Sequence, residues 1–170
     1  MRKPRAAIGS SIFFLAAPGV VAGLLPWLLT DWEFREPLRV WMPFQVVGAV
    51  LVVVGIGILV HAFGRFVREG LGTPAPVAPT EQLVIGGLYR YVRNPMYVAV
   101  LAVILGQALL FGQAVLIPYA AAAFLAMATF ARAYEEPELS RQFGAAYEEY
   151  RRHVPGWWPR RRRWQPESPK

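Results

Sequence analysis

Hydrophobic residues along this chain form long runs without charge, rather than the short alternations of a soluble domain. Residues 6–30 and 40–64 contain no Asp, Glu, Lys or Arg. Each run exceeds the roughly 20 residues that an α-helix needs to cross about 30 Å of hydrocarbon. The pattern therefore predicts two membrane-spanning helices, at about residues 7–29 and 41–64.

A third uncharged run, residues 94–131, is 38 residues long. As one helix it would measure about 57 Å at 1.5 Å per residue, which is too long for a single crossing. A Phe-Gly-Gln sequence at residues 111–113 interrupts the run, and a glycine beside a polar amide is typical of the tight turn in a helical hairpin. The run predicts a third helix at about residues 95–111 and a fourth at about 114–133.

Beyond the fourth run, the apolar positions recur at intervals of three and four residues, with charged residues between them. This spacing predicts an amphipathic helix at about residues 138–153, which either lies at the membrane interface or packs under the bundle. Its apolar stripe consists of Leu139, Phe143, Ala146, Tyr147, Tyr150 and Val154. The predicted fold is a single all-α membrane domain over residues 1–170, with four transmembrane helices and a C-terminal interfacial helix.

Three shorter patterns refine this picture. Glycines in the first two helices predict small faces where neighbouring backbones approach closely; they are Gly19, Gly23, Gly48, Gly55 and Gly57. Three prolines within residues 73–79 favour an extended strap that leads to the third helix. Trp157 and Trp158, followed by four arginines at residues 160–163, are typical of an anchor among lipid head groups.

The composition supports a membrane protein, since 55% of the residues are hydrophobic and the mean hydropathy is +0.34. Of the 18 Lys and Arg residues, only Arg35 and Arg39 fall on the side that would face away from the cytoplasm. The distribution predicts cytoplasmic termini and places the net charge of +7 at one membrane face, where anionic lipids explain it without nucleic acid. A cleaved signal peptide is an alternative for the first run, which is long for that role. The absence of cysteine excludes disulfides and thiol chemistry, and two histidines leave little for a metal centre.

Two polar clusters are predicted to lie at the same cytoplasmic depth. Glu135 and Glu136 follow the fourth helix, and several polar and aromatic residues surround the start of the third. Because a short hairpin joins these helices on the far side, they must run antiparallel, so both clusters could form one pocket. Carboxylates at an interface can also be hydrated or paired, for example with Arg132.

These clusters occur within three motifs that resemble those of membrane methyltransferases, the isoprenylcysteine carboxyl methyltransferase and phospholipid N-methyltransferase group. The motifs are Gly-Leu-Tyr-Arg-Tyr-Val-Arg-Asn-Pro-Met-Tyr at residues 87–97, Tyr-Glu-Glu-Pro-Glu-Leu at 134–139, and a Phe-Gly, Tyr, Tyr, Val-Pro pattern at 143–155. The resemblance covers roughly residues 73–159. It implies S-adenosylmethionine as methyl donor, S-adenosylhomocysteine as product, a cytoplasmic donor site and, through the group's bacterial relatives, a bacterial inner membrane.

The resemblance also implies roles for individual residues. Tyr89 matches the cofactor-contacting tyrosine, and Asn94 replaces the histidine usual in prenylcysteine enzymes. Arg93 and Glu136 are the predicted catalytic residues; the predicted donor-binding residues are Leu83, Val84, Tyr89, Arg90, Asn94, Pro95, Met96, Tyr97 and Glu135. His61 is a second candidate base, although a lone histidine at a helix end is more often an interfacial residue.

The methyl acceptor is open at this stage, because the first two motifs resemble the phospholipid branch and the third the prenylcysteine branch. A phospholipid amine and a prenylcysteine-like carboxylate are both compatible with these motifs as methyl acceptors. An alternative from another class is a non-catalytic four-helix scaffold or lipid-binding protein. A small transporter is a further alternative, disfavoured because the predicted spans contain no charge away from their ends.

Overall fold

The computed structural model describes residues 16–70 and 83–165. Every regular element in these two ranges is helical, and neither range contains a strand, so the predicted all-α class is confirmed for this part of the chain. The proline-rich strap predicted at residues 73–79 lies outside the described residues.

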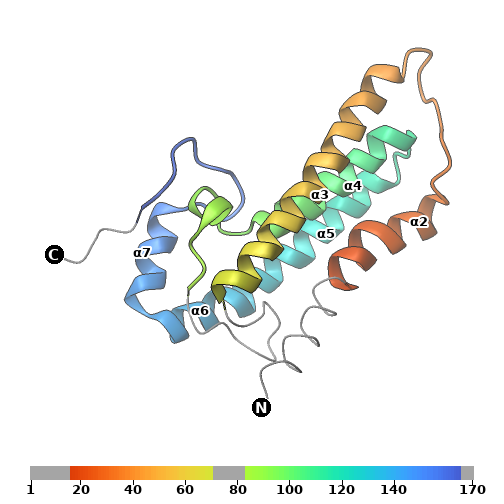
Figure 1. Ribbon diagram of the computed structural model, residues 1–170. Coiled ribbons are helices and arrows are strands. Elements are labelled where there is room, and N and C mark those ends of the chain that lie inside the picture. Colours follow the sequence, from red (N-terminus) through yellow and green to blue (C-terminus); the bar gives the residue numbers. More distant parts are fainter. Residues whose placement is uncertain (1–15, 71–82, 166–170) are drawn as a thin grey trace.

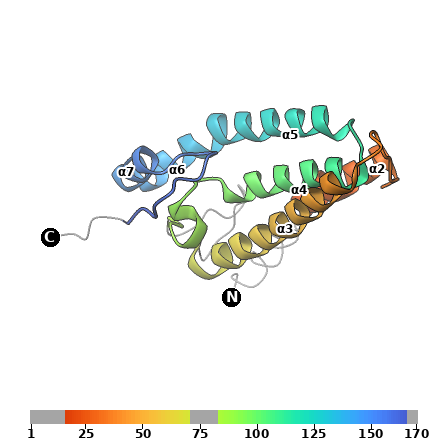
Figure 2. The ribbon, with the colours of Figure 1, turned by 90° about the horizontal axis from the view of Figure 1, so that it is seen from above.

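One long helix and one helical hairpin dominate the arrangement, with α4 lying between α3 and α5 (Figures 1 and 2). The helix at the N-terminal side, Ala16–Thr30, packs against α4 through its π-helical turn. The elements in chain order are η1 (Val20–Leu24), α2 (Leu25–Thr30), α3 (Met42–Gly70), η2 (Gly87–Arg90), α4 (Pro95–Phe111), α5 (Leu116–Phe130), η3 (Ala131–Glu135), α6 (Glu136–Phe143) and α7 (Ala145–His153).

Glycines allow α3 and α4 to approach closely. A Cβ atom at Gly48 would lie 2.5 Å from the backbone nitrogen of Leu110, and one at Gly106 would lie 2.9 Å from the carbonyl oxygen of Gly48. A Cβ at Gly55 would lie 2.7 Å from a methyl group of Val103. The predicted close approach is therefore confirmed at Gly48 and Gly55. Within the described residues it is not found at the other three predicted glycines, where an added Cβ atom would meet nothing within 4 Å: Gly19, Gly23 and Gly57.

The hairpin between α4 and α5 turns at Gly112, as predicted. Gly112 has φ +66°, in the left-handed region that glycine adopts without strain. An added Cβ would also collide with the carbonyl oxygen of Arg35, whose backbone nitrogen donates to the carbonyl of Phe111 at 2.8 Å. The connection between α2 and α3 therefore packs directly on this turn.

The C-terminal helical region differs from the single amphipathic helix predicted at residues 138–153. The helix that begins as α5 continues through the π-helical turn η3 into α6, giving one helix over Leu116–Phe143. Gly144, with φ +51°, ends this helix, and α7 begins a separate one. Hydrophobic spacing alone does not reveal such a break, because the stripe keeps its period on both sides of the glycine.

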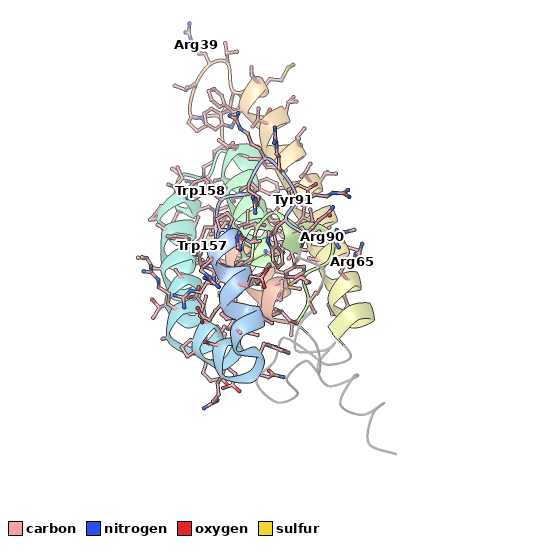
Figure 3. The ribbon with its side chains drawn as sticks, turned by 90° about the vertical axis from the view of Figure 1, so that its left-hand side faces the viewer. Arg39, Arg65, Arg90, Tyr91, Trp157 and Trp158 are labelled. Atoms are coloured by element: carbon pink, nitrogen blue, oxygen red, sulfur yellow. The ribbon has the colours of Figure 1, made fainter. Side chains whose placement is uncertain are left out.

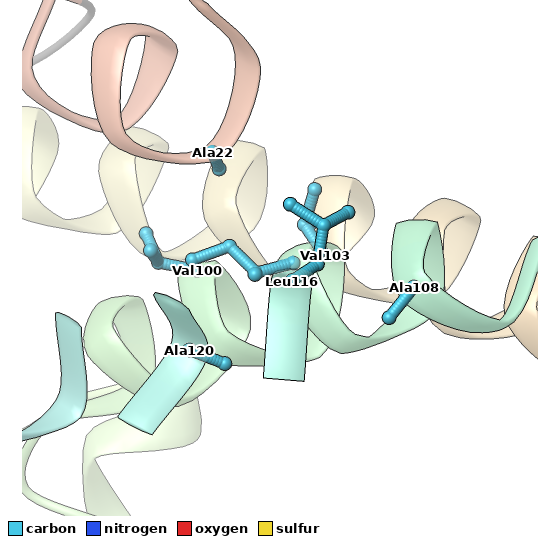
Figure 4. Packing of buried hydrophobic residues seen from close by; sticks show 7 residues of the cluster. Ala22, Val100, Val103, Ala108, Leu116 and Ala120 are labelled. Carbon is cyan, nitrogen blue, oxygen red and sulfur yellow. The ribbon is translucent and has the colours of Figure 1, made fainter. Parts of the chain in front are cut away.

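Three hydrophobic clusters lie among the described residues, and the two larger ones join most of these elements. The first joins the N-terminal helix, α4 and α5 (Figure 4); its buried members are Ala22, Val100, Val103, Ile104, Ala108, Leu116 and Ala120. The second is formed by Tyr147, Tyr150, Val154 and Trp164, with Leu83 packed against it. The buried residues of α7 therefore pack on the C-terminal tail and on the segment before η2. The interfacial location stays a prediction.

Two helices, Met42–Arg65 and Leu116–Phe143, are long and apolar enough to cross a membrane, and two shorter apolar helices are Ala16–Thr30 and Pro95–Phe111. Only 17% and 22% of the apolar windows of the two longer helices are buried inside the protein. A core helix of a soluble protein would be mostly buried, whereas exposed apolar faces of this size are typical of contact with lipid. The structure thus supports association with a membrane.

Candidate functional site

The two polar clusters predicted to meet lie against each other at one end of the helices. The hydroxyl of Tyr97, in the first turn of α4, donates a hydrogen bond of 2.7 Å to Oε1 of Glu135. Arg93, just before α4, forms an ion pair with Glu136, with Nη1 3.2 Å from Oε1. The antiparallel α4–α5 hairpin produces this proximity, because both clusters lie at the ends remote from its turn.

The side chains of two consecutive glutamates reach two different partners. Neighbouring positions on a helix differ by about 100° in direction. Glu135 therefore contacts Tyr97 in the first turn of α4, while Glu136 contacts Arg93 in the segment before α4. The π-helical turn η3 carries Glu135 at its end, and such turns frequently occur at functional sites.

Glu136 is the centre of a partly buried ionic network. Its Oε1 pairs with Arg93, and its Oε2 lies 3.3 Å from Nη2 of Arg151 on α7. Only 14% of the Arg93 side chain and 13% of the Glu136 side chain are exposed. Arg93 Nη1 also donates to the hydroxyl of Tyr147 at 3.2 Å. Burial raises the pKa of the Tyr147 phenol, opposed by the charge of Arg93, so Tyr147 remains a neutral acceptor.

The C-terminal tail covers the start of α4. The backbone nitrogens of Arg93 and Asn94 donate to the carbonyls of Pro155 and Gly156, at 2.9 and 3.2 Å. Next in the tail, the indole of Trp157 stacks on the Tyr97 ring, with centroids 6.0 Å apart and 19° between the planes. The tail is therefore attached to the site by both backbone and ring contacts.

The two adjacent tryptophans of the predicted lipid anchor have different environments. Trp157 packs on Tyr97 and meets Phe124 edge-on at 4.9 Å, whereas 82% of Trp158 is exposed. Both lie on the α5 side of the molecule (Figure 3). Trp158 has the exposure expected of an anchor, whereas Trp157 is only partly exposed because it packs on Tyr97 and Phe124. The lipid anchor itself stays a prediction.

The other predicted donor-binding residues occupy four different places. Val84 and Tyr89 form a small buried cluster with Ala62 of α3, against which Met96 packs. The hydroxyl of Tyr150 donates a 2.7 Å hydrogen bond to the carbonyl of Tyr89, and burial raises the pKa of that phenol. Leu83 packs on the α7 cluster, Pro95 is buried at the start of α4, and Arg90 lines a pocket beside α3.

Sequence reasoning missed the contributions of Tyr147, Arg151 and Trp157. Tyr147 and Arg151 are four residues apart and so share one face of α7. The hydrophobic pattern placed Tyr147 in the apolar stripe of the predicted helix and could not show that Tyr147 and Arg151 contact Arg93 and Glu136, because these partners lie on other elements. Trp157 carried no signal that separated it from Trp158.

One protein family matches this chain. The model of the family described as phospholipid methyltransferase matches residues 44–146, which is more than half of the chain. The match begins in α3 and includes Arg93, Tyr97, Glu135 and Glu136. A search of curated proteins found no match.

Proposed function

This chain belongs to the phospholipid methyltransferase family, and we propose that it transfers the methyl group of S-adenosylmethionine to a lipidic acceptor at the cytoplasmic face of a membrane. The observation that carries the proposal is the pair of contacts Tyr97–Glu135 and Arg93–Glu136. They join two motif segments, far apart in sequence, that a methyltransferase of this group would use.

The proposed membrane arrangement has four crossings, by the four apolar helices, with both termini in the cytoplasm. The exposed apolar surface of α3 and α5 supports it, for example at Val53, Val60 and Leu125, which are 70%, 67% and 64% exposed. Reporters inserted near Ala75 and after Lys170 should both read as cytoplasmic. Opposite readings at these two positions would contradict the arrangement.

The groups around Tyr97 fit the methyl donor. The Tyr97 hydroxyl donates to Oε1 of Glu135, and Oε2 can accept a hydrogen bond from a ribose hydroxyl or an ammonium group of the donor. Arg93 Nε is buried and has no hydrogen-bond partner among the described residues, so it is a donor suited to a carboxylate. The amide of Asn94 adjoins Arg93 at the start of α4 and supplies both a donor and an acceptor. The face of an aromatic ring such as Tyr97 suits a sulfonium cation or an adenine.

S-adenosylmethionine supplies an electrophilic methyl group, so the chain's own task is alignment of the reactants and exclusion of water. Trp157 and the backbone of residues 155–156 cover the start of α4, so they would keep water away from reactants bound there. Tyr97 orients Glu135 through its hydrogen bond. We assign Glu136 a positioning role, because both of its oxygens already engage arginines.

The proposed acceptor is a phospholipid amine, which the family description favours over a prenylcysteine-like carboxylate. The test is methyl transfer from radiolabelled S-adenosylmethionine into a total lipid extract, followed by identification of the labelled species. Labelled phospholipid is expected. Glu135→Gln should lower the incorporated label, whereas Glu138→Gln, which removes a carboxylate from the exposed pair with Arg141, should not.

A separate measurement distinguishes the enzyme from a non-catalytic scaffold of the same fold. Detergent-purified protein is titrated with S-adenosylmethionine and S-adenosylhomocysteine. Saturable binding of both is expected. The absence of saturable binding in folded protein would contradict the proposed function.

A further inference from the structure

A pocket of about 560 Å³ lies on the α3 side of η2, away from Trp157 and Trp158 (Figure 3). Its volume is within the range of roughly 300–1,000 Å³ typical of small-molecule sites. The end of α3 supplies His61 and Arg65, η2 supplies Arg90, and the C-terminal tail supplies Arg163. The pocket therefore gathers basic side chains from three separate segments.

The charge of this pocket is of one sign. Three arginines and one histidine line it, and none of the described lining residues is acidic. Arg90 Nε is buried and has no hydrogen-bond partner among the described residues. A buried donor without a partner is costly, so an anion that accepts from it would stabilise this arrangement.

Gly87 keeps the pocket open. It has φ +56°, which favours glycine, and an added Cβ would lie 3.1 Å from Arg65 Nε and 3.2 Å from His61 Nε2. Any side chain at this position would fill the space that the two basic side chains face. Both the backbone conformation and the close approach therefore preserve a basic cavity.

The pocket and the proposed donor site lie on different sides of the segment between η2 and α4. Arg93 turns toward Glu136 and Tyr147, whereas Arg90 turns toward α3. The backbone between them is fixed by the tail, since Tyr91 and Arg90 accept from the backbone nitrogens of Arg160 and Trp164. These bonds hold the tail, and Arg163 with it, beside the pocket.

We propose that this basic pocket binds a phosphate group, as a second site separate from the methyl-donor site. Guanidinium groups bind phosphate oxygens through paired, charge-assisted hydrogen bonds, and several converging arginines are typical of phosphate recognition. The phosphate can come from a phospholipid head group or from a soluble phosphate ester, and both share this chemistry.

The test uses the full chain purified in an uncharged detergent, with thermal stabilisation as the measure of binding. The titrants are a short-chain phosphatidylethanolamine, the matching diacylglycerol without phosphate, and inorganic phosphate. Saturable stabilisation by at least one phosphate-bearing titrant, and none by diacylglycerol, is expected. A stronger response to the lipid identifies a head-group site, and an equal response to inorganic phosphate identifies a site for soluble phosphate.

Variants connect the effect to the pocket. Arg65→Gln and Arg163→Gln should each weaken phosphate binding by about tenfold, the loss expected for one charge-assisted contact. Arg162→Gln, which removes the same charge from the neighbouring exposed position, should change it by less than about twofold. Equal losses in Arg162→Gln and Arg163→Gln would overturn the proposal, since they would indicate general attraction of anions to the tail.

Donor affinity separates this proposal from the proposed function. S-adenosylmethionine binding should be unchanged in Arg65→Gln and Arg163→Gln. A matching loss of donor binding would overturn the second site, because the pocket would then belong to the donor site. Loss of phosphate binding with donor binding intact supports it, and failure of wild-type protein to bind donor affects only the proposed function.

Discussion

Replacing Glu135 and Glu136 separately should affect different properties: donor affinity in the first case and stability in the second. Glu135→Gln removes a carboxylate whose described partner is the Tyr97 hydroxyl, and that hydroxyl can also donate to a glutamine carbonyl. The free energy of unfolding should therefore change by less than about 0.5 kcal/mol. Donor affinity should fall by about 1.5–3 kcal/mol, or roughly ten- to a hundredfold, because a charge-assisted bond to the donor is lost.

Glu136→Gln should instead destabilise the protein. Removing one partner of a buried ion pair costs about 3–5 kcal/mol. Two features reduce this figure: glutamine keeps one acceptor oxygen, and the second partner, Arg151, is 46% exposed and so contributes little. We expect a loss of about 2–3 kcal/mol, which lowers the Tm by roughly 5–10 °C for a chain of this length.

The assay combines thermal unfolding without donor and equilibrium binding of S-adenosylhomocysteine in detergent. Glu138→Gln serves as the matched control, since its exposed pair should contribute at most about 1 kcal/mol. The double variant Arg93→Gln, Glu136→Gln should be less destabilised than the sum of the single variants, because neither charge is then left unpaired. A normal Tm for Glu136→Gln together with lost donor affinity would refute the division of roles.

Three further outcomes follow from the same contacts. Tyr97→Phe should weaken donor binding about three- to tenfold at unchanged Tm, because Glu135 loses the hydrogen bond that orients it; binding titration checks this. Trp157→Ala should expose the tail to limited proteolysis and reduce methyl transfer, whereas Trp158→Ala should do neither. Burial raises the pKa of Tyr150, so the folded state retains this proton above pH 10 while the unfolded state loses it. The contribution of Tyr150 to the free energy of unfolding should therefore be constant below about pH 10 and fall above it. Tyr150→Phe should make this fall less steep, which unfolding curves at alkaline pH measure.

The sequence predicted most of the described helices, because long uncharged runs leave few alternatives. The turn at Gly112 followed from the length of the third run, and the meeting of Tyr97 with Glu135 followed from the antiparallel hairpin. The break at Gly144 could not be predicted in this way. A positive φ at a glycine depends on the path of the following chain, and hydrophobic period carries no information about that path.

Side-chain partners were harder to predict than helices. Arg93 was predicted to be a catalytic residue, but its pairing with Glu136 and Tyr147 depends on where α6 and α7 lie, which the pattern did not determine. Arg90 was expected in the same site, yet it faces a different pocket, since residues three apart in an irregular segment need not share a direction. Motif membership thus located the region of the site but not the role of each residue.

The tail shows how a segment outside the matched family region takes part in the candidate site. The match ends at residue 146, whereas the tail contacts begin at Pro155. The backbone nitrogen of Asn94, which precedes α4, has its partner in the carbonyl of Gly156, and α4 has no side-chain cap at this end. An unpaired backbone group here would be costly when buried, so the tail contributes to stability and not only to anchoring. Because the next residue, Trp157, also covers the Tyr97 ring, the contacts that complete the start of α4 are the same ones that would keep water from a donor bound there.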